Sequence, residues 1–155
     1  MVNKTLTLDK SATQKIGRHL ERWLADNYLL YLKTQNFHWN VIDPRFHSLH
    51  EMFEEQYKNL SDGIDEIAER MRMIGLKTPA SMKEFLELTS LTEAAGNFSG
   101  NEMITALLND HETIANYLRA EIEEITAFGD QGTADLMIRR LQFHEKSAWM
   151  LKASL

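Results

Sequence analysis

The chain has 155 residues, of which 43% are hydrophobic and 26% are charged, and its formal net charge is −6. This length and composition are typical of one globular domain with its own core, and the negative charge argues against a generally basic surface that coats nucleic acid. The sequence has no cysteine, which excludes both a disulfide framework and a thiolate metal site.

Residues 1–10 are short and polar, and we expect a flexible N-terminal arm followed by a single domain over residues 11–155. The arm has no apolar signal-peptide core and no apolar run is long enough to span a bilayer. We therefore expect a cytoplasmic protein, either free or associated with the nucleoid.

The first predicted helix runs from about Ser11 to about Trp39. Ser11 and Gln14 form a capping-box pattern, which is typical of a helix start. Asp43 and Pro44 end the helical pattern, because proline disfavours helix at the residue before it. The connecting loop is short, so the first two helices should be antiparallel neighbours.

The second predicted helix runs from Phe46 to Gly75. Apolar residues recur along it in steps of three and four, which is the spacing of one helical stripe. They are Phe46, Leu49, Phe53, Tyr57, Leu60, Ile64, Ile67, Met71 and Ile74. Gly75 is typical of the residue that follows a helix.

Three further helices complete the prediction. Ser81 with Glu84 indicates the start of a helix of about two turns, and Ser99 with Glu102 indicates the start of a third long helix. Thr133 is expected to cap the last helix. We expect an all-α bundle of four long helices, with the short helix between the second and third of them.

Ionisable residues run along the second helix beside its apolar stripe: His50, Glu54, Asp65 and Glu69. His50 and Glu54 are one turn apart, as are Asp65 and Glu69, so each pair presents two possible ligands together. Imidazole with carboxylates suits iron, zinc or manganese. Glu54 and Asp65 are separated by about 16 Å along the helix axis, whereas metal–ligand bonds are about 2 Å long. The two pairs therefore cannot bind one ion from a single straight helix.

Two interpretations of these pairs remain open. The pairs are unrelated, with the acids forming ordinary interface ion pairs in a plain helical oligomer, or two copies of the helix lie antiparallel about a two-fold axis. A two-fold axis would place His50 and Glu54 of one chain opposite Asp65 and Glu69 of the other. It predicts a metal site shared between chains. His38, across a short loop from His50, is a further candidate ligand.

The remaining histidines give weaker signals. Trp39 and His47 are neighbours of the candidate ligands in sequence, and we regard both as possible outer neighbours of the site, with Trp39 also a possible packing anchor. His19 and His111 have no evident carboxylate partners. His144 lies on the inward stripe of the last helix, which predicts a core or interface residue.

Several stretches resemble the signature of the Dps family, the mini-ferritins. They are Asn36–Val41 (NFHWNV), Phe46–Glu54 (FHSLHEMFE) and Asp65–Arg70 (DEIAER), and the likeness extends over nearly the whole chain to His144–Leu151 (HEKSAWML). The resemblance implies a ferritin-like four-helix bundle, assembled as a hollow dodecamer.

The resemblance also implies an activity. Members of this family oxidise Fe²⁺ at a ferroxidase site on the two-fold interface, with hydrogen peroxide as the preferred oxidant over oxygen, and store ferric mineral in protection against oxidative stress. The implied iron-binding and catalytic residues are His38, His50 and Glu54 from one subunit, with Asp65 and Glu69 from its partner. Many members carry Asp at the position of Glu54.

Two other family properties bear on this sequence. Iron enters family shells through acidic pores on three-fold axes, and the nearby candidates are Glu121, Glu123, Glu124, Asp130 and Asp135. Members that coat DNA often use a lysine-rich tail, whereas the first ten residues here contain only Lys4 and Lys10. Because phosphate contacts need clustered basic residues, strong DNA binding at physiological salt is not expected. An architectural shell that binds and compacts DNA without significant catalysis is the competing hypothesis.

Overall fold

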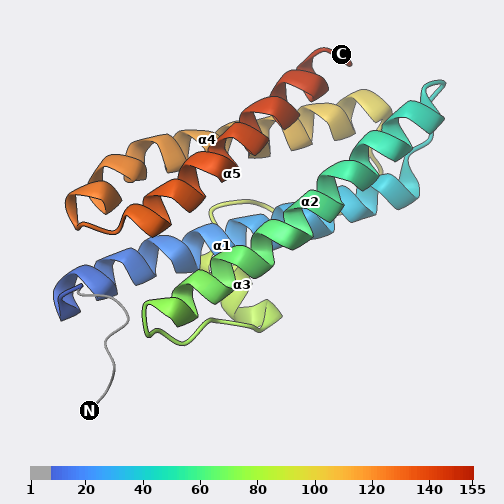
Figure 1. The fold of residues 1–155 in the computed structure, drawn as a ribbon. Coiled ribbons are helices and arrows are strands. Elements are labelled where there is room, and N and C mark those ends of the chain that lie inside the picture. The colour runs from blue at the N-terminus through green and yellow to red at the C-terminus, as the bar shows by residue number, and fades with distance from the viewer. Residues whose placement is uncertain (1–7) are drawn as a thin grey trace.

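A computed structural model of the chain describes residues 8–155, so most of the predicted arm lies outside the described residues. Over that range the structure contains five α-helices and no strand. They are α1 (Lys10–Asn40), α2 (Phe46–Met73), α3 (Met82–Leu88), α4 (Gly100–Ala127) and α5 (Gln131–Lys152). The prediction of an all-α fold, with a short helix between the second and third long helices, is confirmed (Figure 1).

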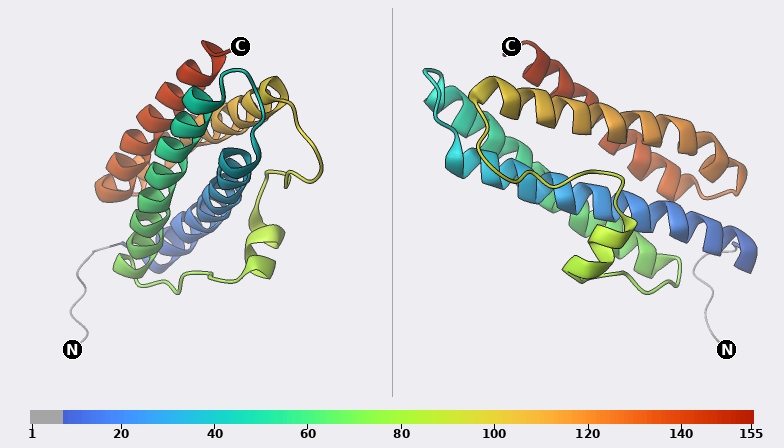
Figure 2. Two further views of the ribbon diagram at one scale, coloured as in Figure 1. Left: turned by 90° about the vertical axis from the view of Figure 1, so that its right-hand side faces the viewer. Right: turned by 180° about the vertical axis from the view of Figure 1, so that it is seen from behind.

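The four long helices form two hairpins (Figure 1). α1 packs along α2 and α4 packs along α5, with further contacts between α1 and α4. The short α3 lies against α1, and the segment after it runs beside α1 to reach the start of α4 (Figure 2). This crossover lets the second hairpin join the first in one bundle.

The apolar stripes of the helices meet in one core. Fully buried members include Trp23, Leu30, Phe37, Phe53, Leu60, Ile67, Ile104, Leu118 and Met137. Burial of a side chain of this size stabilises the folded state by about 1.5–3 kcal/mol relative to exposure. Two aromatic residues differ from the prediction: Phe46, on the expected stripe of α2, is 47% exposed, and Trp39, a possible packing anchor, is 63% exposed.

Two helices begin earlier than predicted, because an aspartate caps each of them. α1 begins at Lys10, since the Asp9 carboxylate accepts a hydrogen bond from the backbone amide three residues later at 2.7 Å. α5 begins at Gln131, since the Asp130 carboxylate accepts from the backbone amide of Thr133 at 3.0 Å. Thr133, the predicted cap, therefore lies inside the first turn of α5.

Other helix ends agree with the sequence. Ser99 and Glu102 form a reciprocal capping box at the start of α4. Gly75 follows α2 with a φ of 88°, a conformation that glycine adopts without strain. Backbone hydrogen bonds from Gly75 to Arg72 and from Leu76 to Met71, each 3.0 Å long, form a Schellman motif. These bonds fix the end of the helix that holds most of the candidate ligands.

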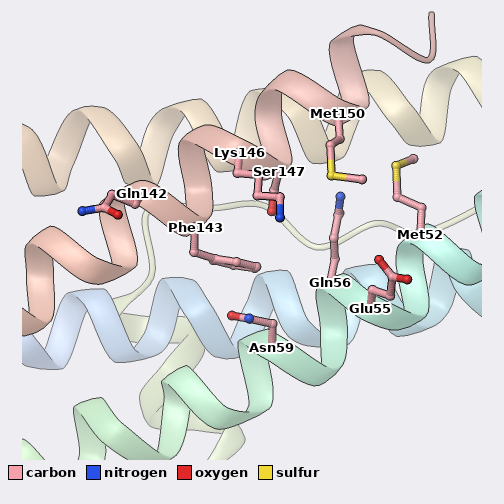
Figure 3. A pocket seen from close by; sticks show the side chains of 9 residues that line it. All are labelled: Met52, Glu55, Gln56, Asn59, Gln142, Phe143, Lys146, Ser147 and Met150. Carbon is pink, nitrogen blue, oxygen red and sulfur yellow. The ribbon is translucent and has the colours of Figure 1, made fainter.

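Polar contacts join α2 to α5. Arg139 Nη1 lies 3.0 Å from Glu66 Oε2, and Arg140 Nη1 donates to Asn59 Oδ1 at 2.7 Å. Burial lowers the pKa of Arg140 to about 10. Beyond these contacts the two helices enclose a cavity of about 350 Å³, lined by Met52, Glu55, Gln56, Asn59, Gln142, Phe143, Lys146, Ser147 and Met150 (Figure 3). No helix within residues 8–155 has the length and apolar character needed to cross a membrane.

Candidate metal centre

His38 near the end of α1 and His50 near the start of α2 lie against each other. Their rings stack with centroids 3.8 Å apart and planes inclined by 15°. His38 Nδ1 lies 2.8 Å from the His50 carbonyl oxygen, and His50 Nδ1 lies 2.7 Å from the His38 carbonyl oxygen. A carbonyl oxygen only accepts hydrogen bonds, so each Nδ1 must carry the hydrogen. In the neutral rings each Nε2 then has a free electron pair, as in histidines that bind metals.

The connection between α1 and α2 fixes the position of this histidine pair. Asp43 accepts hydrogen bonds from the backbone amide and the Nε of Arg45, both at 2.8 Å. These bonds lower the pKa of Asp43 to about 2. Arg45 also donates to Asn101 Oδ1 of α4 at 2.8 Å. The turn is therefore tied to the neighbouring hairpin as well as to itself.

Glu54 lies one turn after His50 on α2 and is half-buried. Its carboxylate forms an ion pair with Lys58, one turn further on. The hydrogen bond from Lys58 lowers the pKa of Glu54, and His38 and His50 add smaller effects in the same direction. Glu54 is thus an ionised carboxylate at neutral pH, one helical turn from His50, and Lys58 competes with any cation for it.

Asp65 and Glu69 are exposed on the other half of α2. Within residues 8–155, neither side chain makes a hydrogen bond or an ion pair. Arg70, the residue after Glu69, lies 2.5 Å from Asp130. The single chain thus places His38 against His50, with Glu54 one helical turn further along α2, and leaves Asp65 about 16 Å from Glu54 along the helix.

The two possible outer neighbours of the site lie on the surface. His47 is 81% exposed and lies 3.2 Å from Glu51 of the same helix. Trp39 lines a surface cavity of about 340 Å³ beside α1, together with Leu32 and Glu93. In the described part of the chain neither makes a hydrogen bond to the stacked histidines.

Asp130, one of the candidate pore acids, is bonded to other groups of its own chain. Its side chain is buried and accepts hydrogen bonds from Arg70 at 2.5 Å and from the Thr133 hydroxyl at 2.5 Å, besides capping α5. Both carboxylate oxygens are therefore occupied within the chain.

The structure also reveals a cluster that the sequence did not indicate. His19 of α1 lies against Glu121 and Glu124 of α4, with nitrogen–oxygen distances of 3.3 Å and 3.1 Å. His19 and Glu124 are 105 residues apart in sequence. Helical periodicity orients a side chain relative to its own helix but does not identify its partner on another helix, so no local pattern predicts this contact.

Comparisons with known proteins cover almost the whole chain. The ferritin-like domain family matches residues 18–155. A Bacillus anthracis protein named DNA protection during starvation protein 2 is 42% identical over 136 residues, which is 88% of this chain and 93% of that one. The crystal structure of a Dps protein from Bacillus brevis superposes with a TM-score of 0.90 at 37% identity, covering 94% of this chain and 98% of that one. The crystal structure of a Dps protein from Vibrio cholerae O1 superposes with a TM-score of 0.92 at 30% identity, covering 99% of this chain and 96% of that one. It is described as a member of a broad superfamily of ferritin-like diiron-carboxylate proteins.

Proposed function

The chain belongs to the Dps proteins of the ferritin-like family, and from this premise we propose that it oxidises Fe²⁺ and stores the ferric product inside a shell of twelve chains. Hydrogen peroxide is the proposed preferred oxidant, with oxygen as the alternative. Removal of Fe²⁺ together with peroxide protects against oxidative stress. The observation that supports this most directly is the reciprocal pairing of His38 and His50, which leaves both Nε2 atoms free beside the ionised Glu54.

The proposed site is completed by a second chain. His38, His50 and Glu54 of one chain supply half of the ligands, and the partner's Asp65 and Glu69 supply the other half. Two features support this arrangement: the two acids are exposed and unpaired within the described chain, and antiparallel pairing of α2 about a two-fold axis brings the ends of the helix together. The diiron-carboxylate description of the Vibrio cholerae relative supports iron as the substrate.

The proposed reaction transfers two electrons to each peroxide. Two Fe²⁺ ions give one electron each, the O–O bond breaks, and two protons complete two water molecules: 2 Fe²⁺ + H₂O₂ + 2 H⁺ → 2 Fe³⁺ + 2 H₂O. Because both electrons reach the same peroxide, no hydroxyl radical is released. The carboxylates of Glu54, Asp65 and Glu69 stabilise the higher charge of the ferric product, and the imidazoles suit the ferrous substrate.

The test is anaerobic loading with Fe²⁺, followed by addition of hydrogen peroxide, with the particle mass measured by light scattering on the same sample. We expect rapid oxidation, with the iron retained in a soluble particle of about twelve chains, as the family likeness implies. The variant Asp65→Ala/Glu69→Ala should assemble normally and oxidise Fe²⁺ at least about tenfold more slowly, since even outer-shell partners of metal ligands account for about 10–100-fold.

A matched control removes two carboxylates at other positions, so that the net charge changes by the same amount. Glu87 of α3 and Glu112 of α4 are exposed acids on helices other than α2. Glu87→Ala/Glu112→Ala should retain the wild-type rate. Oxidation at the wild-type rate by Asp65→Ala/Glu69→Ala would contradict the proposal.

The same experiment addresses the competing hypothesis of an architectural shell. An intact particle that oxidises no Fe²⁺ above the buffer blank would favour DNA binding as the main role, which a gel-shift assay at defined salt then measures. The low basic content of the N-terminal segment, with Lys4 and Lys10 as its only cations, argues against that outcome. Cytoplasmic location stays a prediction.

A further inference from the structure

His19 lies between two carboxylates of a different helix. Its Nδ1 is 3.3 Å from Glu121 Oε2, and its Nε2 is 3.1 Å from Glu124 Oε2. Taking one ligand atom from each residue, the three atoms lie within 4.8 Å of one another. Among residues 8–155 this is the one group of three histidine or acidic side chains gathered so closely.

Tyr117 lies beside Nδ1 of the His19 ring. The Tyr117 hydroxyl lies 3.3 Å from the His19 carbonyl oxygen, to which it donates, and 3.0 Å from His19 Nδ1. Burial raises the pKa of Tyr117, so the phenol keeps its hydrogen. When that hydrogen is directed at the carbonyl, the phenol oxygen accepts from Nδ1–H. In the neutral ring, the electron pair of Nε2 then faces the Glu124 carboxylate.

A ring nitrogen and a carboxylate oxygen 3.1 Å apart share either a hydrogen atom carried by the nitrogen or a cation. We propose that His19, Glu121 and Glu124 bind a divalent transition-metal ion. Atoms that bind one ion at about 2.0–2.2 Å lie no more than about 4.4 Å apart, so the three ligand atoms need only a small closing movement. One imidazole with two carboxylates suits Zn²⁺, Mn²⁺, Fe²⁺ or Co²⁺, whereas Mg²⁺ and Ca²⁺ prefer oxygen ligands alone.

The cations closest along α1 leave these carboxylates free. Arg22 lies over the ring of Tyr117 at 4.3 Å, and Lys15 lies over the ring of Phe128 at 5.5 Å. Within the described chain neither forms an ion pair with Glu121 or Glu124. Among residues 8–155, the two carboxylates therefore have no lysine or arginine within ion-pair distance, and the His19 ring is the nitrogen group that faces them.

The cluster is separate from the proposed ferroxidase site. His19 and His38 are nineteen residues apart on α1, which is about 28 Å along the helix axis. All three ligands belong to one chain, so the site needs no partner subunit. The inference goes beyond iron oxidation and stands independently of it.

The test uses Co²⁺ alone as the probe, in the assembled protein carrying Asp65→Ala/Glu69→Ala so that the proposed interface site is disabled. Bound Co²⁺ per chain is measured by equilibrium dialysis, and its visible absorption reports nitrogen and oxygen coordination. We expect one Co²⁺ per chain. His19→Gln, which keeps a hydrogen-bonding side chain, and Glu121→Gln should each weaken binding by more than about tenfold.

Glu112→Gln is the matched control, because it removes one exposed carboxylate from the same helix outside the cluster, and it should leave Co²⁺ binding unchanged. If His19→Gln disturbs folding, Glu121→Gln and Glu124→Gln carry the test, since both keep the size of the side chain. Unchanged affinity in these variants, or no Co²⁺ bound before they are introduced, would overturn the proposal and leave polar contacts between α1 and α4 as the role of the cluster.

Discussion

At the scale of single residues, two histidines inside the α4–α5 hairpin are kept neutral by burial. The Nδ1 atoms of His111 and His144 lie 2.9 Å apart, and both side chains are 0% exposed. Burial lowers the pKa of His111 to about 3 and that of His144 well below its ordinary value, and the charge of Arg140 acts in the same direction. One ring therefore donates its Nδ1 hydrogen to the other at neutral pH.

This pair predicts a stability that falls with acidification. In the unfolded chain each histidine titrates near about 6.5, so below that pH the unfolded state binds more protons than the folded state. The contribution of the two neutral histidines to the free energy of unfolding is fully present above about pH 6.5. It is lost progressively down to about pH 3, which is the folded pKa of His111. The loss is at most about 1.4 kcal/mol per pH unit for each histidine. The free energy of unfolding, measured between pH 7 and 5 at fixed protein concentration, should fall less steeply in His111→Gln/His144→Gln. Equal slopes in the two proteins would show that these histidines titrate normally.

The stacked pair at the proposed ferroxidase site allows ligation to be separated from packing. His50 lies between His38 and Phe46, with ring centroids 3.8 Å and 5.0 Å away. His50→Phe keeps an aromatic ring in this stack but removes the Nε2 ligand. We expect the initial rate of ferric absorbance to fall at least about tenfold while the particle mass stays unchanged. Phe46→Leu changes the stack without removing a ligand and should oxidise Fe²⁺ normally; a similar loss in both variants would make packing the cause.

At the scale of helices, Asp130 joins the start of α5 to α2. It caps α5 and pairs with Arg70, whose side chain is 15% exposed against 1% for Asp130. Asp130→Ala removes the cap and leaves Arg70 without its buried partner, which together should destabilise the fold by about 3–5 kcal/mol. Chemical denaturation measures this. Asp135→Ala, which removes an exposed partner of Arg139, is the control and should change stability by less than about 1 kcal/mol.

Helical periodicity predicted the elements because each long helix buries one apolar stripe. It did not fix where α1 and α5 begin, since more than one good capping residue stands at each start. Ser11 and Thr133 were expected, whereas Asp9 and Asp130 make the capping hydrogen bonds. A capping pattern identifies candidates, and tertiary contacts such as the one between Asp130 and Arg70 select among them.

The same distinction applies to the sites. The short loop after α1 was enough to predict that His38 and His50 lie close together. The hydrogen bonds that free their Nε2 atoms were not predictable, because they involve backbone carbonyls whose directions depend on how the two helices meet. The cluster at His19 depends entirely on the packing of α1 against α4, so no local pattern in the sequence indicated it.

At the scale of the whole molecule, one chain carries both halves of the proposed ferroxidase site but does not bring them together. The histidine pair lies near the start of α2, and Asp65 and Glu69 lie toward its end. Because α2 continues as one helix of 28 residues to Met73, the chain does not turn back to bring these acids to the histidines. If the site exists, iron oxidation is therefore a property of the assembly, and the two halves must come from different chains.

This requirement predicts complementation between two inactive chains. A His38→Ala/His50→Ala chain lacks one half of the site, and an Asp65→Ala/Glu69→Ala chain lacks the other. In a mixed dimer one site loses both halves, whereas the second receives an intact half from each chain. Random mixing makes half of the dimers mixed, with one of their two sites intact, so co-assembled particles should recover about a quarter of the wild-type oxidation rate. Blends of separately assembled particles should recover no oxidation activity. If co-assembled particles oxidise Fe²⁺ no faster than those blends, the ligands belong to a single chain.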